Sequence, residues 1–200
     1  MNFSGDLEDF KVDTSLKSIA ITSATTGEGK TTIALNLARA SASMGKKVLL
    51  VDTDLRSSNC VTKDLGMENS IGLRNILTRE NPNLSLDCCQ QVPQEENLHI
   101  LTSGFESNAN SAGVDPSRLL ASTKMRSIME ELRNHFDLVI YDLCAIVGFA
   151  DVNLLSAKTD GIIMVTGLGK IQTTALKEAL SQLRLCKAPI LGVAVNKMVP

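Results

Sequence analysis

The order of apolar runs along the chain is the feature that most constrains its fold. Short runs rich in Val, Ile and Leu alternate with stretches of helical periodicity. The runs are continuous rather than alternating with polar residues, which is typical of strands buried on both faces of a sheet. We therefore predict a single α/β domain with a mainly parallel sheet flanked by helices on both faces. The predicted strands are residues 16–24, 46–54, 97–104, 137–144, 160–167 and 189–196, and the predicted helical stretches are 31–45, 115–136 and 171–187.

Composition excludes several classes of protein. A chain of 200 residues with 44% hydrophobic content suits one domain, over residues 1–200. The formal net charge is −2 and no dense Lys/Arg block occurs, so nucleic acid is not an expected partner. The cysteines have no C-x-x-C spacing, which favours reduced thiols in a cytosolic compartment: Cys60, Cys88, Cys89, Cys144 and Cys186. No apolar run reaches the roughly 20 residues that cross a bilayer, so any membrane link has to come through another segment or a partner.

Two stretches have the composition of loops rather than of core. Residues 81–94 contain Pro, Asn, Gln and two adjacent cysteines, and residues 106–116 are rich in Ser, Asn, Ala and Gly. We expect the first to be a surface loop and the second to lie over the active face, at the carboxyl ends of the strands.

The sequence SATTGEGKTT, residues 23–32, follows a predicted strand and opens a predicted helix. In this context Gly27 and Gly29 allow backbone N–H groups to turn toward a phosphate group, and the helix N-terminus favours an anion. Lys30 would then reach the outer phosphates and Thr31 would place its hydroxyl on a magnesium ion. The pattern predicts a P-loop NTPase-like site for ATP and Mg²⁺ formed by Thr26, Gly27, Glu28, Gly29, Lys30, Thr31 and Thr32.

A second motif, VLLVDTDLRSSN, places two acidic residues at the end of the next predicted strand. Side chains alternate along a strand, so Asp52 and Asp54 point to one side, and Arg56 joins them if the chain stays extended. Two carboxylates facing the phosphates can hold the waters of a Mg²⁺ ion and accept a proton from a hydroxyl nucleophile. In the alternative, both residues have only a structural role: Asp54 caps the following segment and Arg56 pairs with it at the surface.

A third acidic position closes the strand LVIYD. Asp142 corresponds to the aspartate that polarises a metal-bound water in P-loop enzymes. Asp151, nine residues later, could be a further ligand, but we interpret it as a helix N-cap.

Together these motifs resemble the bacterial tyrosine kinase (BY-kinase) family, the cytoplasmic kinase domains of capsular and exopolysaccharide regulators. The resemblance rests on S-x-x-x-G-E-G-K-[ST]-T, D-x-D-x-R and the apolar run ending in Asp142, and it covers nearly the whole chain. It implies that Asp52, Asp54 and Lys30 are catalytic, with Asp52 as the base toward a tyrosine hydroxyl. It also implies that Thr31, Asp52 and Asp142 hold Mg²⁺ and that Asn196 meets the adenine edge.

The resemblance further implies partners and a location. The acceptor would be the tyrosine-rich tail of a neighbouring copy or of a partner, and the full-length protein could form a ring oligomer. A membrane-anchored polysaccharide co-polymerase segment or activator would hold the domain in the cytoplasm at the inner face of the plasma membrane. We expect residues 1–200 to be the excised core of a longer protein, without the N-terminal docking helix and the tyrosine tail of the family.

Departures from the family pattern leave two other functions open. Thr26 replaces the usual Pro of the phosphate loop, and Asp142-Leu143-Cys144-Ala145 replaces D-[ST]-P-P. A nucleotide-switch ATPase of the MinD/ParA kind, acting with a membrane partner without phosphorylating protein, is the first alternative. The second is a small-molecule kinase, for which no lid insertion is evident in the sequence.

Overall fold

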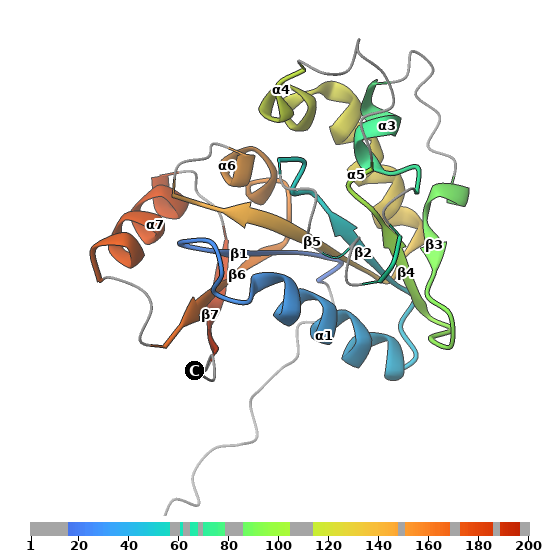
Figure 1. Cartoon of the computed structure of the whole chain (residues 1–200), viewed down its shortest axis with the longest axis horizontal. Helices are drawn as coiled ribbons and strands as arrows, with labels where there is room; N and C mark the ends of the chain where they lie inside the picture. The colour runs from blue at the N-terminus through green and yellow to red at the C-terminus, as the bar shows by residue number, and fades with distance from the viewer. Residues whose placement is uncertain are drawn as a thin grey trace, which may run out of the picture.

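The fold is described from a computed structural model of the chain. The residues described are 16–56, 61, 65–67, 70–78, 86–104, 114–147, 151–168, 173–185 and 189–196. Their strands form one seven-stranded sheet in the order β3-β4-β2-β5-β1-β6-β7 (Figure 1). The strands are β1 (Ser18–Ser23), β2 (Val48–Asp52), β3 (Gln90–Gln91), β4 (Leu98–Leu101), β5 (Leu138–Ala145), β6 (Gly161–Gly167) and β7 (Ile190–Asn196).

Every strand pair is parallel except β3–β4, which is antiparallel. All of β1, β2 and β5 is buried, as the continuous apolar runs predict. The predicted α/β fold with a mainly parallel sheet is confirmed, and all six predicted strands are present. Since β1, β2 and β5 are neighbours, the residues that follow them meet at one edge of the sheet.

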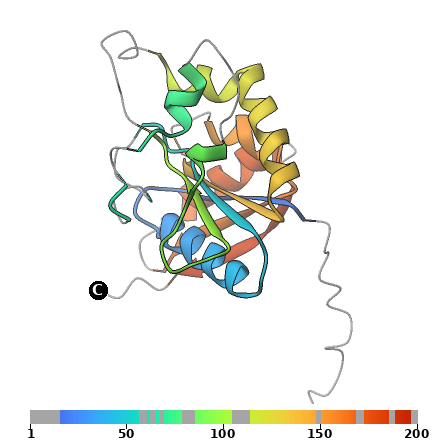
Figure 2. The same ribbon diagram turned by 90° about the vertical axis from the view of Figure 1, so that its right-hand side faces the viewer.

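Helices cover both faces of the sheet. Figure 2 shows α1 (Lys30–Ser43) on one side and α5 (Thr123–His135) on the other. Ala34, Ala38 and Ala42 recur at the four-residue spacing of one helical face and are buried against the sheet, because small side chains allow α1 to approach it closely. The opposite layer holds α5 with α6 (Asp151–Ser156) and α7 (Thr173–Leu185).

Two regions differ from the sequence prediction. The helical stretch 115–136 is broken into α4 (Pro116–Ala121) and α5, because Ser122 is extended (φ −64°, ψ 155°) and caps α5 through its hydroxyl. Within residues 81–94, a short 3₁₀ turn, Leu86–Cys88, is followed by β3, and Cys89 is buried. This part of the predicted surface loop therefore belongs to the sheet and its core. Of the predicted segment 106–116, residues 106–113 lie outside the described residues.

The remaining described helix, α3 (Leu73–Thr78), supports the chain beyond β2. Arg74 on this helix is buried and its guanidinium donates to the backbone carbonyl of Leu55. Arg74 N also donates to Ser103 O at 2.9 Å, which ties α3 to the segment after β4. These contacts fix the path of the chain just after the acidic motif.

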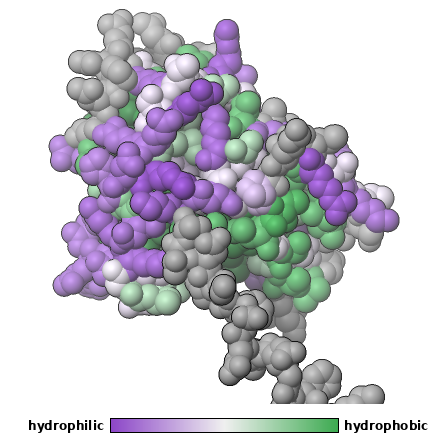
Figure 3. All heavy atoms as spheres, turned by 180° about the vertical axis from the view of Figure 1, so that it is seen from behind, coloured by the Kyte–Doolittle hydropathy of each residue, from purple (hydrophilic) through white to green (hydrophobic). Residues whose placement is uncertain are grey.

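The surface at the back of the molecule has one apolar half and one hydrophilic half (Figure 3). In Figure 3 apolar side chains gather on the half that carries β6, β7 and α7, while the other half is mostly hydrophilic. On the edge strand β7, Leu191, Val193 and Val195 are all exposed. Among the described residues, no helix combines the length and the apolarity needed to span a membrane. Cys88, Cys89 and Cys144 are free thiols.

Candidate active site

The phosphate loop connects β1 to α1 at the carboxyl edge of the sheet. Gly27 and Gly29 have φ angles of +82° and +88°, a conformation that side chains other than glycine rarely adopt. At Gly29 a Cβ atom would also lie 2.1 Å from Asn196 Nδ2, so a side chain there would displace the Asn196 amide. The loop thereby enters α1 directly at Lys30, which leaves the first backbone N–H groups of a 14-residue helix at the loop.

A buried carboxylate, Glu28, holds the loop in shape. One oxygen accepts hydrogen bonds from Thr25 N at 2.6 Å and Thr25 Oγ1 at 2.9 Å. The other accepts from Gly167 N at the end of β6, at 3.0 Å. Only 1% of Glu28 is exposed, so these bonds replace the water that the carboxylate loses. Glu28 therefore joins the phosphate loop to the neighbouring strand.

Asn196 connects the same loop to β7. Its Nδ2 donates to Glu28 O at 3.1 Å. The sequence prediction assigns this side chain to an adenine edge, which remains a prediction. Asn196 lies at the correct end of the sheet for that role, and its side-chain carbonyl is not used in the bond to Glu28.

Lys30 and Asp54 face each other across the loop. Lys30 Nζ lies 3.9 Å from Asp54 Oδ2 and 3.4 Å from Thr31 Oγ1, and both charged side chains are about nine-tenths buried. Asp54 Oδ1 also accepts from Arg56 N at 3.3 Å. Asp54 thus both faces the lysine and caps the turn that follows it. The expected cap is present, but the described side-chain bonds of Arg56 go to other residues, and the role of Asp54 toward a metal or an acceptor remains a prediction.

Asp52 and Asp142 form a carboxylate pair across β2 and β5. They are opposite each other in the parallel register, and neither is exposed. The backbone of Asp142 is fixed by Thr53, whose N–H and hydroxyl donate to Asp142 O at 3.1 and 2.6 Å. Asp54 N donates to Asp52 Oδ1 at 3.2 Å. The predicted acidic group is therefore assembled, with Asp52, Asp54 and Asp142 at one edge of the sheet.

Among the described residues, no hydrogen bond of normal geometry reaches the carboxylate of Asp142. Both of its oxygens are buried, and neither makes a hydrogen bond to any described residue. Burial raises the pKa of Asp142 to about 6, while the positive charge of Lys30 and the nearby hydroxyl of Thr31, which is not placed for a well-formed hydrogen bond, oppose the rise. A buried carboxylate without donors is costly unless a cation completes it.

These residues fit Mg²⁺, although they do not enclose it. The described residues contain no cluster of three or more His, Cys, Asp or Glu side chains that could hold a metal alone. Mg²⁺ is usually held by one or two carboxylates together with phosphate oxygens and water, which matches Asp52 and Asp142 beside a phosphate loop. The hydroxyl of Thr31, at the start of α1, is the third predicted ligand.

Arg56 points to a different group of residues from the one predicted. Its Nε and one terminal nitrogen donate to the two oxygens of Asp151 at 2.8 and 3.3 Å. The same terminal nitrogen donates to Asp115 at 3.2 Å and to Ser117 Oγ at 2.7 Å. The chain leaves the strand at Asp52, so Arg56 does not extend the row of Asp52 and Asp54. It joins the end of the acidic motif to the first turns of α4 and α6.

This network corrects the interpretation of Asp151 as an N-cap. Asp151 is the first residue of α6 and is 4% exposed. Its described bonds come from Arg56, from the hydroxyl of Ser117 and from the thiol of Cys144, and none comes from a backbone N–H of its helix. The cap that is present belongs to Asp115, whose Oδ1 accepts from Ser117 N at 3.1 Å at the start of α4.

The altered third motif continues as strand. β5 extends through Leu143 and Cys144 to Ala145, all buried, and Thr22 Oγ1 donates to Cys144 O at 2.8 Å. Burial raises the pKa of the Cys144 thiol to about 12, so the thiol is neutral at physiological pH. The missing prolines are therefore replaced by strand hydrogen bonds to β1.

Sequence reasoning missed how the loop and the acidic residues are held. Glu28 was expected only as a phosphate-loop residue, and Thr53 was not singled out. The T-x-x-E spacing from Thr25 to Glu28 is a local signal, since this pattern is known from capping boxes at helix starts. The bonds from Thr53 to β5 and from Gly167 to Glu28 are not readable from spacing, because they depend on strand order.

The chain matches the family model for an AAA domain over residues 16–189. It is 36% identical over 191 residues to tyrosine-protein kinase YwqD of Bacillus subtilis. The aligned region covers 96% of this chain and 76% of that protein. Tyrosine-protein kinase CpsD of Streptococcus pneumoniae is 34% identical, over 92% of this chain and 77% of that protein. The succinoglycan biosynthesis transport protein ExoP of Rhizobium meliloti is 34% identical, over 90% of this chain but 22% of that protein.

Solved structures with a similar fold include a tyrosine kinase domain and MinD. The kinase domain of the Escherichia coli tyrosine kinase ETK superposes with a TM-score of 0.81 at 25% identity, covering 93% of this chain and 69% of that chain. The septum site-determining protein MinD from Pyrococcus horikoshii, complexed with Mg-ADP, superposes with a TM-score of 0.70 at 26% identity, covering 90% of this chain and 70% of that chain.

Proposed function

This chain belongs to the bacterial tyrosine kinase family, and we propose that it transfers the γ-phosphoryl group of ATP to tyrosine side chains. The observation that carries the proposal is the buried Asp142 carboxylate, opposite Asp52 and beside the phosphate loop, which receives no well-formed hydrogen bond from the described part of the chain. A structural carboxylate would be paired like Glu28. One left without donors, next to a phosphate site, fits a residue that acts with a cation and a nucleotide.

Each side chain has a defined part in this proposal. The N–H groups around Gly27 and Gly29 bind the phosphates, and Lys30 moves from Asp54 to the outer phosphate oxygens. Bound Mg²⁺, held by Thr31, Asp52 and Asp142, supplies neutralisation of the phosphate charge. The tyrosine oxygen bonds to the γ-phosphorus while the bond between that phosphorus and the bridging oxygen of ADP breaks. Asp52 accepts the proton that the tyrosine hydroxyl loses. Asp54, released from Lys30, orients the incoming hydroxyl.

The acceptor is not the tyrosine of this domain. Tyr141 is the only tyrosine in the sequence, it lies in the middle of β5, and it is 1% exposed. We propose that the acceptor is a tyrosine-rich tail of a neighbouring copy or of a partner, reached in a ring or a similar assembly. ExoP, of which only 22% corresponds to this chain, supports a domain that works beside a larger transport segment at the membrane.

The test is a phosphotyrosine assay with Mg-ATP and a polypeptide that contains a tyrosine cluster. We expect phosphotyrosine from the wild type, almost none from Asp52→Ala, and a normal signal from Glu178→Gln, a control on the exposed surface of α7. If wild type and Asp52→Ala give the same negligible signal while both still bind ATP, the kinase proposal is wrong.

The nucleotide-switch ATPase is the second candidate, because the MinD structure in its Mg-ADP complex shares this fold at 26% identity. It predicts steady ATP hydrolysis that a partner stimulates, without any phosphotyrosine. Measuring ADP release and phosphotyrosine in the same reaction separates the two functions.

A further inference from the structure

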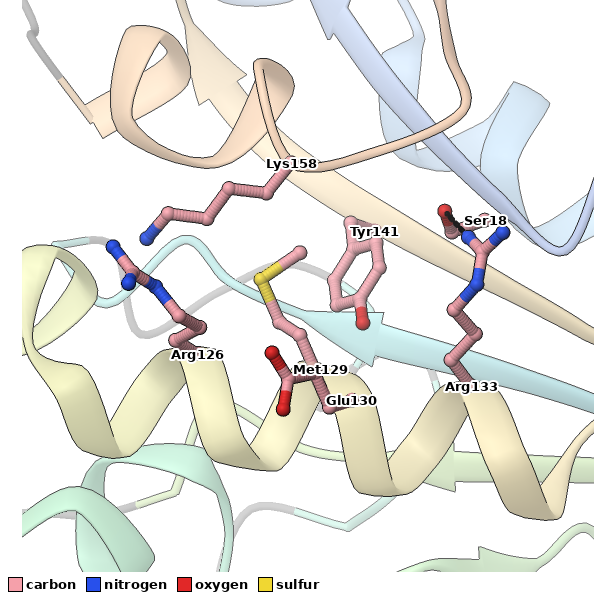
Figure 4. Close-up of a pocket in the computed structure, with 7 residues that line it drawn as sticks. All are labelled: Ser18, Arg126, Met129, Glu130, Arg133, Tyr141 and Lys158. Carbon is pink, nitrogen blue, oxygen red and sulfur yellow. Dashed lines mark hydrogen bonds between the residues drawn. The ribbon is translucent and has the colours of Figure 1, made fainter.

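A pocket on the opposite side of β5 from Asp142 has no part in the proposed function. It has a volume of about 210 Å³ and lies between α5, β5 and the turn after α6 (Figure 4). Tyr141, which forms part of its lining, is adjacent in sequence to Asp142, and neighbouring residues of a strand point to opposite faces of the sheet. The pocket is therefore separate from the phosphate loop.

Two cationic side chains lie at one end of the pocket without an ion-pair partner among the described residues. The side chains of Arg126 on α5 and Lys158 after α6 make no ion pair or hydrogen bond with any described residue. In Figure 4 the ammonium group of Lys158 is directed toward the guanidinium of Arg126. Burial lowers the pKa of Lys158, and the positive charge of Arg126 lowers it further. Two like charges brought together at a cavity are repulsive until an anion separates them.

The floor of the pocket offers a further donor. Tyr141 is 1% exposed, and its hydroxyl makes no hydrogen bond with a described residue, so it is available to a ligand in the pocket. Figure 4 shows the hydroxyl directed at α5, and Met129 beside the ring gives the pocket an apolar wall.

The other end of the pocket is already neutral. Arg133 NH1 donates to Asp160 at 2.6 Å and to Ser18 Oγ at 3.0 Å, so its charge is compensated. Glu130 on α5 also lines the pocket, and its negative charge opposes an anionic ligand. With Arg133 and Asp160 cancelling, Arg126, Lys158 and Glu130 leave one net positive charge.

We propose that this pocket binds a phosphate group, with the oxyanion between Arg126 and Lys158. The planar guanidinium matches two oxygens of a phosphate, and the ammonium adds a compact charge. A phosphate ion fills only the charged end, whereas the organic part of a small phosphate monoester rests on Met129 and the ring of Tyr141. Inorganic phosphate and a monoester share this chemistry and differ in whether they use the apolar wall.

The test is calorimetric titration of the intact chain with inorganic phosphate and with phenyl phosphate. The Lys30→Met variant serves as the parent, so that binding at the phosphate loop does not contribute. We expect both probes to bind and phenyl phosphate to bind more tightly.

Arg126→Ala and Lys158→Ala should each weaken binding about tenfold or more, because each removes a charge-assisted contact. Glu130→Gln should tighten binding several-fold, and Lys177→Ala, the same charge change on the exposed surface of α7, should leave it within about twofold.

A second measurement reports on the floor of the pocket. The chain has one tyrosine and no tryptophan, so its intrinsic fluorescence comes from Tyr141 alone. Saturating inorganic phosphate should change this fluorescence in the parent and not in Lys158→Ala. The proposal is overturned if neither probe binds at up to about 10 mM, where even millimolar affinity would be seen. It is also overturned if Lys158→Ala and Lys177→Ala bind phosphate equally. Because no step depends on phosphotransfer, these outcomes are independent of the kinase assay.

Discussion

Glu28 and Asp142 are both buried carboxylates at the same end of the sheet, but the fold treats them in opposite ways. Glu28 accepts hydrogen bonds from Thr25 on one oxygen and from Gly167 on the other. Neither carboxylate oxygen of Asp142 accepts a well-formed hydrogen bond from a described residue, although its backbone carbonyl receives two bonds from Thr53. Local structure therefore positions Asp142 firmly without satisfying its charge.

This difference separates residues that stabilise the fold from residues that wait for a ligand. A buried carboxylate with donors contributes to stability, whereas one without donors reduces it until a cation binds. Substitutions at the two positions should accordingly have opposite patterns: loss of stability at Glu28, and loss of activity with no loss of stability at Asp142.

The largest effect is expected for Asp142→Asn. The change keeps the shape of the side chain and removes the charge that the proposed Mg²⁺ needs, so we expect phosphotransfer to fall about 100-fold or more. The free energy of unfolding, measured in urea without nucleotide, should stay the same or increase, because an uncompensated buried charge disappears. A variant that loses stability and activity together would place Asp142 in the same class as Glu28.

Glu28→Ala should reduce stability, the property that Asp142→Asn is expected to leave intact. It leaves Thr25 N and Gly167 N without their acceptor, and we expect the free energy of unfolding to decrease by about 2 to 3 kcal/mol. Glu28→Gln keeps one acceptor oxygen and should lose less. The exposed control Glu178→Ala should stay within about 0.5 kcal/mol of wild type. Equal stability of Glu28→Ala and this control would show that the bonds of Glu28 do not support the loop.

The pH dependence sharpens the same comparison at Asp142. Its pKa is raised from the ordinary 3.8 to about 6 in the folded chain. Between these values the folded state binds more protons than the unfolded state, so this residue makes stability fall as pH rises through that window. The penalty is absent below the lower value and complete above the higher one, where it amounts to about 3 kcal/mol.

Urea unfolding of wild type and Asp142→Asn at several pH values isolates the contribution of Asp142 and its coupling to nearby charges, because carboxylates far from it titrate equally in both proteins. The advantage of Asp142→Asn should grow from pH 4 to pH 6 and then level off. Addition of Mg²⁺ and nucleotide above pH 6 should remove it, since a ligand that binds only the folded wild type stabilises that protein. A stability difference that does not change with pH would show that Asp142 does not titrate in this range.

The sequence predicted the parts of the structure that depend on local pattern. Continuous apolar runs placed all six predicted strands, and the loop at residues 23–32 predicted the start of α1. The strand β3 was missed because Gln90 and Gln91 carry no apolar pattern. It forms only because β4 offers an unpaired edge. The break at Ser122 was missed because its neighbours on both sides keep helical periodicity.

The site was predicted as a set of residues but not as a network. Strand alternation and the carboxyl-edge rule were enough to bring Asp52, Asp54 and Asp142 together near Lys30. The same alternation failed at Arg56, because the strand ends at Asp52 and the following turn redirects the chain. Its partners come from segments about 60 and 95 residues away, which no local spacing can indicate.

The smallest effect is expected at Arg56, where two acidic partners differ in burial. Asp151 has 5% of its side chain exposed and binds two nitrogens of Arg56, whereas Asp115 has 50% exposed and binds one. Arg56→Lys cannot reproduce the two-nitrogen contact, and we expect a loss of about 1 kcal/mol in the free energy of unfolding.

Double-mutant cycles with Asp151→Asn and Asp115→Asn measure the two coupling energies separately. The coupling to Asp151 should exceed the coupling to Asp115, because water screens the exposed pair. Equal couplings would mean that burial does not set the strength of this network, and the rule that separates Glu28 from Asp142 would then not extend to the end of the acidic motif.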